Sequence, residues 1–400
     1  MDRRALLCGS RERGSAVSFV GPVSIDVEGD SRVARHVRDE LSNPDPRPDP
    51  TATSIELGVH QEGVGSRLSQ AARTIRDSRA PYRFRAAVFE DQFELAIGLK
   101  TPPFWLYSVR VKGDLLGDGA VVADVHLPKL GLASAVARPF LALFGRDGLS
   151  LSELMAKNVL YEIVDPLVWT RMLGAGSALV HASAIAMGDE GILFSGSGGV
   201  GKSSALLALM QHRPDVRYLS DDLAILLPGG ELERHPKRLQ IYEYNLRDAP
   251  GVRDRLDELS SVSGRMWWRI KVRLLGSRRV RRRVSAASLF GEGRVADRAK
   301  LSKAVWILPS GDSEPRWAPL SAAGFAELAT SAILSEFWDF LRLLNGVTLA
   351  GAEIEPVTAL AARSRALIEK SLAGVECRTL HVPAGFGGES LAVFLESSIL

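Results

Sequence analysis

The sequence has little cysteine, little net charge and no long apolar run, and each shortage excludes a class of protein. Its two cysteines, Cys8 and Cys377, cannot build a disulfide framework and have no zinc-ligand spacing. Fifty Lys and Arg residues against 47 Asp and Glu residues leave a net charge of +3, so bulk charge does not favour a nucleic-acid partner. No apolar run reaches the ~18 residues of a membrane span, and the N-terminus lacks the apolar stretch of a signal peptide. We therefore expect a cytoplasmic protein without a transmembrane segment.

The length and the overall composition fit a globular protein with two domains. Its 400 residues exceed one average domain, and 46% hydrophobic with 24% charged residues is ordinary for a folded chain. In the first part, apolar and polar residues alternate between glycines and prolines, which predicts strands. These runs cover residues 16–20, 23–27, 54–60, 83–89, 93–99, 105–111 and 120–127. They predict a β-rich (α+β) N-terminal domain over residues 1–145, whose role the sequence does not reveal.

The rest of the chain, residues 146–400, has the pattern of an α/β domain. From Ala178 onward, short apolar strands alternate with helical segments. Toward the end, Phe325 to Leu344 shows apolar residues at helical spacing. This spacing predicts a single helix whose Phe337, Trp338 and Phe340 lie in the core.

The strongest motif is a glycine-rich loop between an apolar strand and a helix. It fits G-x-x-x-x-G-K-[ST], follows the strand Ile192–Phe194, and leads into helix-forming residues that begin at Lys202. The glycines let successive N–H groups converge on a β-phosphate, and the helix N-terminus adds its positive dipole end. Lys202 would reach the β- and γ-phosphates, and the Ser203 hydroxyl would ligate Mg²⁺. The sequence therefore predicts ATP and Mg²⁺ as cofactors, with the nucleotide bound by Gly196, Ser197, Gly198, Gly199, Val200, Gly201, Lys202, Ser203 and Ser204.

Two adjacent carboxylates follow the next predicted strand, Val216–Leu219. Asp221 and Asp222 come almost directly after this strand, just beyond the helix that follows the loop. One carboxylate can hold Mg²⁺ while the other accepts a proton from an attacking hydroxyl. Like charges this close push the two titrations apart, which helps one of them act as a base. The alternative is a solvated turn that carries two acids.

A histidine upstream of the loop gives these motifs a context. His181 lies in the apolar run Leu179–Met187, where a lone histidine is more often a core or interface side chain. Its spacing to the loop and to the Asp pair resembles the HPr kinase/phosphorylase family, whose members carry a strand histidine, a Gly-Val-Gly-Lys-Ser loop and an Asp-Asp pair. The resemblance covers roughly residues 175–385, and its specific motifs lie within residues 181–222. The wider family includes diverged serine kinases of ribosomal-peptide biosynthesis.

The resemblance implies a fold and a role for each matched residue. It implies a P-loop kinase domain of the HPr kinase C-terminal type, with Asp221, His181 and Lys202 as the catalytic residues. Asp221 would be the general base, and Asp222 would lie with Ser203 on the metal side, although the residues alone do not separate the two acids. His181 would orient or neutralise the transferring group. Ser204 replaces the family's glutamate and no Arg-Gly-Leu-Gly signature follows, which argues against HPr as the substrate.

A basic tract, residues 265–283, lies within an insertion over residues 260–285. Trp267 and Trp268 stand near its start, and its pattern allows either a strand or an amphipathic helix. Three interpretations stay open: an acidic protein or peptide partner, a surface of anionic lipid, or a solvated insertion. Nothing else in the chain supports nucleic acid as a partner. The tract contains no acid and nine basic residues: Arg265, Arg269, Lys271, Arg273, Arg278, Arg279, Arg281, Arg282 and Arg283.

The function that these features favour is an ATP- and Mg²⁺-dependent kinase that transfers the γ-phosphoryl group to a serine-type hydroxyl of a peptide or protein. A kinase for a small-molecule hydroxyl fits the same residues. The alternative from a different class is a nucleotide-gated binding or regulatory module. Lys237, Arg238 and Lys300 are candidates for a second cation near the γ-phosphate. The sequence does not decide whether the chain forms a homo-oligomer.

Overall fold

Two units divide the chain. The first falls within residues 1–139, 150–175 and 337–360, and the second within residues 140–149, 176–336 and 361–400. The boundary expected after residue 145 differs from this division, because the helical segments 150–175 and 337–360 group with the N-terminal strands. The computed structural model describes residues 16–41, 53–62, 86–89, 92–98, 106–117, 119–128, 151–247, 249–349, 351, 353–383 and 385–398, so Cys8 lies outside the described residues.

A seven-stranded mixed sheet forms the centre of the first unit. The strands lie in the order β1-β2-β3-β7-β6-β5-β4, and β3 pairs in parallel with both β2 and β7. Each of the predicted N-terminal strands overlaps a strand of this sheet within the described residues. The strands are β1 (Ala16–Val20), β2 (Val23–Glu28), β3 (Thr53–Glu62), β4 (Ala86–Phe89), β5 (Gln92–Gly98), β6 (Leu106–Lys112) and β7 (Val121–Pro128).

Helices from three parts of the chain complete the first unit. They are α1 (Arg32–Leu41), α4 (Leu151–Val159), the π-helical turn η2 (Leu160–Val164), α5 (Asp165–Gly174) and α11 (Trp338–Leu349). All of α5 except Gly174 is buried. Its Arg171 is fully buried, and the guanidinium donates hydrogen bonds to the carbonyl oxygens of Asp114 (2.9 Å), Gly117 (2.6 Å) and Gly119 (2.5 Å). These bonds explain why α5 belongs with the N-terminal strands.

A mixed sheet of nine strands forms the centre of the second unit. Seven strands follow the order β11-β9-β10-β16-β13-β12-β8, and β18 pairs with both β16 and β17. The central strand β10 is parallel to β16 and antiparallel to β9. The strands are β8 (Ala178–Val180), β9 (Ala182–Met187), β10 (Glu190–Gly196), β11 (Val216–Ser220), β12 (Ala224–Leu227), β13 (Glu231–Glu233), β16 (Arg298–Ser310), β17 (Arg316–Pro319) and β18 (Glu376–Pro383).

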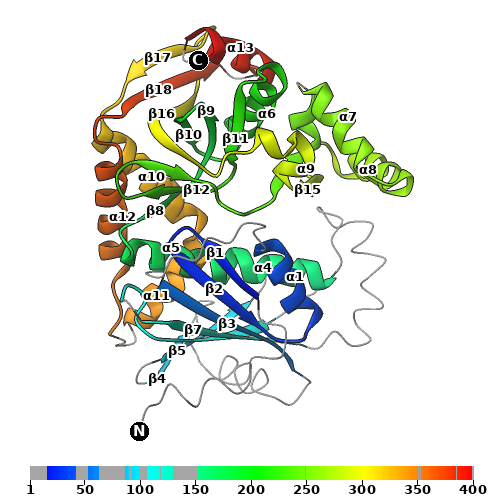
Figure 1. Cartoon of the computed structure of the whole chain (residues 1–400). Helices are drawn as coiled ribbons and strands as arrows, with labels where there is room; N and C mark the ends of the chain where they lie inside the picture. The colour runs from blue at the N-terminus through cyan, green and yellow to red at the C-terminus, as the bar shows by residue number, and fades with distance from the viewer. Residues whose placement is uncertain are drawn as a thin grey trace. The chain divides into compact units, whose positions relative to one another are not determined.

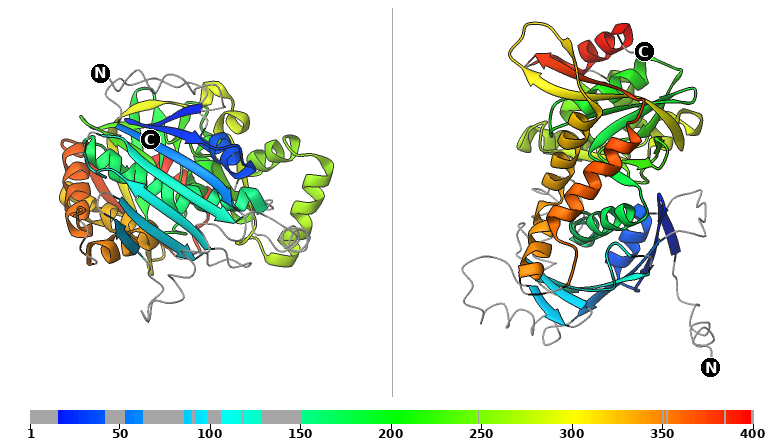
Figure 2. Two further views of the ribbon diagram at one scale, coloured as in Figure 1. Left: turned by 90° about the horizontal axis from the view of Figure 1, so that it is seen from below. Right: turned by 90° about the vertical axis from the view of Figure 1, so that its left-hand side faces the viewer.

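Helices cover both faces of this sheet, so the second unit has three layers (Figures 1 and 2). Alternating residues of β10 face opposite cores, as the pleat of a strand requires. Ile192 and Phe194 pack with α6 (Lys202–His212) and α13 (Gly388–Ser398). Leu193 packs on the other face, with α10 (Ala322–Glu336) and α12 (Val357–Ser371). The predicted α/β character of this part of the chain is confirmed.

A group of short elements projects from the sheet of the second unit (Figure 1). It contains β14 (Leu239–Tyr242), η3 (Glu243–Leu246), α7 (Pro250–Glu258), α8 (Val262–Leu275), β15 (Arg281–Val284), α9 (Ala286–Phe290) and η4 (Glu292–Arg294). The N-terminal half of the basic tract therefore adopts the helical alternative. No helix within the described ranges is both long and apolar enough to cross a bilayer.

The single helix expected over Phe325 to Leu344 is wrong. The chain instead forms α10, which ends at Glu336, and α11, which begins at Trp338. The side chain of Phe337 is buried as predicted, but Trp338 is 59% exposed. The two helices also belong to different units, so the apolar spacing continues across a break that the sequence does not mark.

Candidate functional site

Two interruptions in the sheet of the second unit lie opposite each other and gather the candidate residues. The first separates β8 from β9 at His181, and the second separates β11 from β12 at Asp221 and Asp222. β9 pairs with β11 on one side of the interruptions, and β8 pairs with β12 on the other side, both antiparallel. The two interruptions therefore lie next to each other in the sheet. The Ala182 amide donates a hydrogen bond of 3.2 Å to the Asp222 carbonyl across them. His181 therefore lies at a bend between two strands rather than inside one strand, as the sequence had indicated.

The glycine-rich loop joins β10 to α6, as the motif predicted. Gly196, Gly199 and Gly201 have φ angles of 148°, 80° and 99°, a region that L-residues with a side chain rarely adopt. A Cβ atom on Gly196 would also lie 2.6 Å from the Ile307 carbonyl oxygen. At Gly198 a Cβ would meet nothing within 4 Å, so the tip of the loop is open. The loop is thus exposed at its tip and held tightly at its base.

Lys202 begins α6 and points back along the loop. Its Nζ atom donates hydrogen bonds to the carbonyl oxygens of Gly196 (2.8 Å) and Ser197 (3.0 Å). Burial lowers the pKa of Lys202 to about 8, against the opposing effect of Asp221 and Asp222. The ammonium group is therefore still mostly protonated at pH 7. This charged amine lies at the base of the glycine-rich loop, where it bonds to the loop carbonyls.

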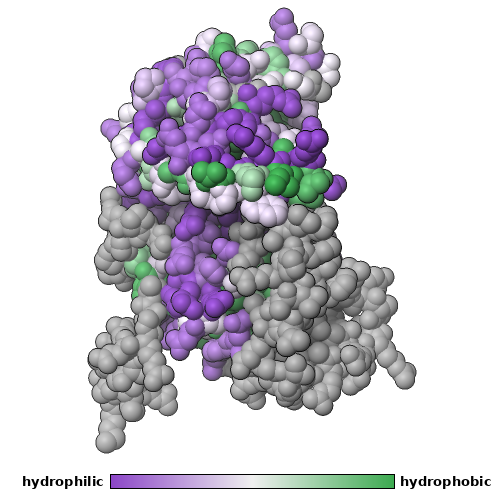
Figure 3. Space-filling model, turned by 90° about the vertical axis from the view of Figure 1, so that its right-hand side faces the viewer, coloured by the Kyte–Doolittle hydropathy of each residue, from purple (hydrophilic) through white to green (hydrophobic). Residues whose placement is uncertain are grey.

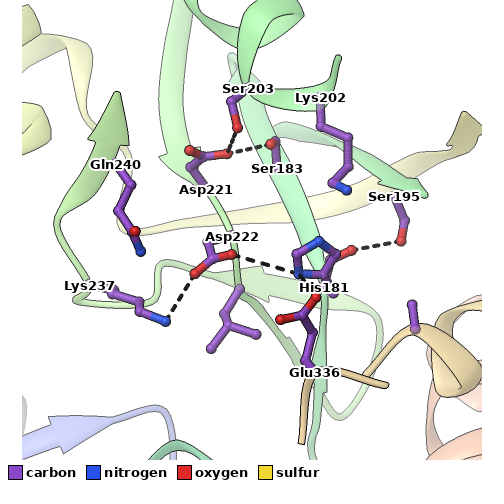
Figure 4. A network of polar contacts seen from close by, with 12 residues as sticks. His181, Ser183, Ser195, Lys202, Ser203, Asp221, Asp222, Lys237, Gln240 and Glu336 are labelled. Carbon is purple, nitrogen blue, oxygen red and sulfur yellow. Dashed lines mark hydrogen bonds and ion pairs between the residues drawn. The ribbon is translucent and has the colours of Figure 1, made fainter. Parts of the chain in front are cut away.

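Asp221 accepts hydrogen bonds from two serines at one carboxylate oxygen (Figure 4). The Ser183 hydroxyl donates to Oδ1 at 2.6 Å, and the Ser203 hydroxyl donates to the same atom at 2.9 Å. Burial raises the pKa of Asp221, and the two serine hydrogen bonds oppose that rise. Ser203 follows the loop lysine, so this carboxylate is tied to the first turn of α6. The sequence did not point to Ser183, whose only signal is its place two residues after His181.

Asp222 faces a different set of groups from its neighbour. Its backbone is left-handed, with φ of 73°, which turns the side chain away from Ser203. Its Oδ2 atom accepts a hydrogen bond of 3.0 Å from Lys237 Nζ, and its Oδ1 atom lies 3.8 Å from His181 Nδ1. Burial favours the neutral acid, but Lys237 and then His181 outweigh burial and lower the pKa of Asp222 to about 2. The two carboxyl pKa values thus move in opposite directions, as expected for this pair.

His181 is buried and uncharged at neutral pH. Burial and then Lys202 lower its pKa to about 4. Its Nδ1 atom has no hydrogen-bond partner among the described residues, and it lies 3.9 Å from Glu336 Oε1. Glu336 closes α10, and sequence analysis missed it because a single long helix was expected there. A neutral imidazole can orient a neighbouring group, and without a bound ligand it carries no positive charge to offset a phosphoryl group.

The remaining predicted residues lie at different distances from this cluster. Ser204 leaves the loop and accepts a hydrogen bond of 2.8 Å from Asn245 Nδ2. Of the candidate cations, Lys237 contacts Asp222, and Arg238 is exposed. In the parallel pairing of β10 with β16, Lys300 lies opposite Glu190 at the start of β10. This position is roughly 20 Å along the strand from the loop. Lys300 is therefore not part of the site.

The chemical groups that line the site fit a nucleoside triphosphate with Mg²⁺. The open tip at Gly198 and Gly199 leaves space for phosphate oxygens beside backbone N–H groups. The hydroxyl of Ser203 and the carboxylate of Asp221 offer the hard oxygen ligands that Mg²⁺ takes, with the other positions left to phosphate and water. The unpartnered Nδ1 atom of His181 faces the same cluster.

Comparison with known proteins gives a distant likeness among solved structures. No protein-family model matches the chain, and no curated protein matches it. Among solved structures, the chain is similar to the Hpr(Ser) kinase/phosphatase from Coxiella burnetii, with 11% sequence identity over 55% of this chain and 91% of that chain. The TM-score is 0.26, which is too low to establish a shared fold. Membership of an HPr kinase-like family stays a prediction, and the chain itself is a mixed α/β protein.

Proposed function

We propose that this protein is an ATP- and Mg²⁺-dependent kinase that phosphorylates a hydroxyl group, of the serine type on a peptide or protein. The observation that carries the proposal is that two adjacent carboxylates have different partners. Asp221 bonds to Ser203 on the nucleotide side, and Asp222 bonds to Lys237 on the other side. Phosphoryl-transfer enzymes use one acidic group on the metal side and a separate group beside the attacking nucleophile, so two carboxylates with different partners fit a kinase.

In this proposal, backbone N–H groups of the loop and the Lys202 ammonium hold the β- and γ-phosphates. Lys202 exchanges its present bonds to the Gly196 and Ser197 carbonyls for phosphate oxygens. Ser203 and Asp221 hold the metal side. Bound Mg·ATP supplies the transferable phosphoryl group and offsets its negative charge.

Asp222 is the proposed general base, which reverses the roles that the family resemblance implied. Its side chain is 32% exposed, so an incoming hydroxyl can reach it, whereas the whole of Asp221 is only 7% exposed. Asp222 accepts the hydroxyl proton while the hydroxyl oxygen forms its bond to the γ-phosphorus and the bond to the β-phosphate oxygen breaks, which releases ADP. Lys237 keeps the base ionised, and the neutral His181 lies beside it, with Nδ1 3.8 Å from Oδ1.

The experiment that tests this proposal follows the γ-phosphate. The full chain is incubated with Mg²⁺, γ-labelled ATP and a lysate of the source cell, beside a Lys202→Ala variant and a matched Lys300→Ala control. Lys300 is a lysine of the same unit that lies away from the loop. We expect a labelled peptide or protein with the parent and with Lys300→Ala, and none with Lys202→Ala.

Other outcomes would change the proposal in defined ways. Label in a small metabolite would identify a small-molecule kinase that uses the same residues. Nucleotide binding without any labelled product, including free phosphate, would contradict the kinase and support a nucleotide-gated module. Equal labelling with Lys202→Ala would contradict the site itself.

A further inference from the structure

The helix α8 exposes the side chains that a surface helix normally buries. Val262, Met266, Ile270 and Leu274 recur every four residues and are 73%, 57%, 36% and 57% exposed. Residues four apart lie on one side of a helix, so the four form a continuous apolar stripe, roughly 18 Å long. Trp267 extends it on one side and is 44% exposed. An exposed patch of this kind marks an interaction surface.

The opposite side of α8 is fixed to the second unit. Trp268 and Lys271 are the buried residues of this helix. Trp268 Nε1 donates a hydrogen bond of 2.5 Å to Glu243 Oε2, and the Arg282 guanidinium lies 4.4 Å from the centre of the Trp268 ring. These contacts fix which side of α8 faces the second unit. The apolar stripe, on the opposite side of the helix, therefore faces outward. Figure 3, which faces the side from which α7 and α8 project in Figure 1, shows apolar residues gathered in one band.

Arginines border the apolar stripe. Arg269 and Arg273 lie four residues apart along its edge, and Arg278 and Arg279 follow in the turn after α8; all four are exposed. None of the four contacts a carboxylate among the residues that the structure describes. The other arginines of the basic tract have internal roles: Arg265, for example, donates hydrogen bonds to the Asp257 and Ser260 carbonyls. The free positive charge of the tract is therefore concentrated beside the apolar stripe.

We propose that α8 docks on an anionic lipid surface and holds the protein at the membrane as a peripheral protein. An apolar stripe with an exposed tryptophan, bordered by arginines, is the pattern of a helix that lies in the interface plane of a bilayer. The arginine stems extend over the apolar region while their guanidinium groups reach lipid phosphates. The helix is a projecting convex ridge, around which lipid can close, whereas a peptide partner usually requires a groove. This inference does not depend on phosphoryl transfer.

The test measures binding of the full chain to vesicles of phosphatidylcholine alone and of phosphatidylcholine with one quarter phosphatidylglycerol. We expect binding to the anionic vesicles that weakens with added salt, and much weaker binding to the neutral vesicles. Arg269→Ala with Arg273→Ala should weaken binding about 30-fold. Met266→Glu with Ile270→Glu should weaken it about tenfold or more, because the stripe can no longer enter the acyl boundary.

Matched variants separate α8 from the rest of the surface. Leu349→Glu with Val393→Glu places the same two charges at exposed apolar positions of α11 and α13, and it should bind vesicles much as the parent does. Arg316→Ala with Arg365→Ala removes two exposed arginines elsewhere and should cost little. Lys202→Ala should bind vesicles like the parent, so a failed kinase assay leaves this inference untouched.

A spectroscopic readout reports insertion directly. Tryptophan emission should shift to shorter wavelength on anionic vesicles, and Trp267→Phe should remove most of that shift. No vesicle binding, or binding that the α8 variants leave unchanged, would overturn the proposal. A dimer that Met266→Glu with Ile270→Glu dissociates, or capture of polyglutamate without vesicle binding, would overturn it in favour of a second copy or an acidic protein partner.

Discussion

Lys237 and Asp222 form an ion pair in which Nζ lies 3.0 Å from Oδ2, while the other oxygen of the same carboxylate lies 3.8 Å from His181. This pair keeps a half-buried acid ionised against the cost of its partial burial. The lysine and the aspartate come from segments fifteen positions apart, on either side of β12 and β13. Control of the proposed base is therefore built into the sheet of the second unit and needs no ligand.

Replacing Lys237 with methionine should move the acid limb of phosphoryl transfer toward neutral pH. The pKa of Asp222 is about 2 because Lys237 outweighs burial, so without the ammonium burial should raise this pKa above its usual 3.8. The acid limb should move up by roughly 2 pH units. Lys237→Arg retains the charge and should leave the limb in place. The measurement is label transfer between pH 3 and pH 7, where the parent and Lys237→Arg should stay active at the acid end and Lys237→Met should lose activity. An unmoved limb in Lys237→Met would show that Asp222 is not the base.

The two aspartates should lose different functions when each is changed to asparagine. Asp222→Asn should lower transfer by roughly 10²-fold to 10⁴-fold, because an amide cannot accept the proton, and nucleotide affinity should hardly change. Asp221→Asn should weaken binding of Mg·ADP by roughly 10-fold to 100-fold, because the amide still accepts a hydrogen bond from Ser203 but removes the negative charge on the metal side. Calorimetry with and without Mg²⁺ separates the two effects. The opposite result would restore the assignment that the family resemblance implied.

His181 should make the protein less stable in mild acid. Its pKa is about 4 in the folded chain and 6.5 when unperturbed, so between these values the unfolded chain binds more protons and stability falls as the pH falls. Between pH 7 and pH 5 this loss is roughly 2 kcal/mol. Denaturant unfolding at both pH values should show a smaller fall in His181→Gln. The buried His235, with a pKa of about 3, should leave part of the fall in place.

Arg171 should be worth far more to stability than an exposed arginine. Its guanidinium holds carbonyl oxygens of Asp114, Gly117 and Gly119, and Arg171→Met would leave them without a donor. We expect a loss of roughly 3 kcal/mol or more in the unfolding free energy of the first unit. Arg342→Met, which loses a surface ion pair with Asp339 in the same unit, should change it little. Equal losses in the two variants would contradict the structural role of Arg171.

The sequence predicted those parts of the fold that neighbouring residues determine. The strand Val23–Glu28 was visible because its buried and exposed residues alternate. The loop from Gly196 to Ser204 was visible because its conformation depends on glycines within one short segment. The helix α1 was missed although its buried Val33, Val37 and Leu41 recur every four residues among charged positions, which is a clear helical signal.

Residues that reach the site from other segments could not be found in this way. Lys237 and Glu336 lie fifteen and 114 positions from Asp222 along the chain, and only the folded sheet and the end of α10 bring them near it. The break at Phe337 was hidden because apolar spacing continues across it. The assignment of base and metal ligand depends on the φ angle of 73° at Asp222, a backbone property that a non-glycine residue does not reveal.

The chain enters the first unit in three separate stretches, and this has a consequence for how the protein can be shortened or recombined. A single cut after residue 145 would leave α4, α5 and α11 on the fragment that carries the loop, away from the strands with which they group. Their apolar side chains would then face water, and the fragment would tend to aggregate. A gene fusion or deletion should therefore keep these helices together with their sheet. Because the stretches of the two units alternate along the chain, no single cut separates one unit from the other.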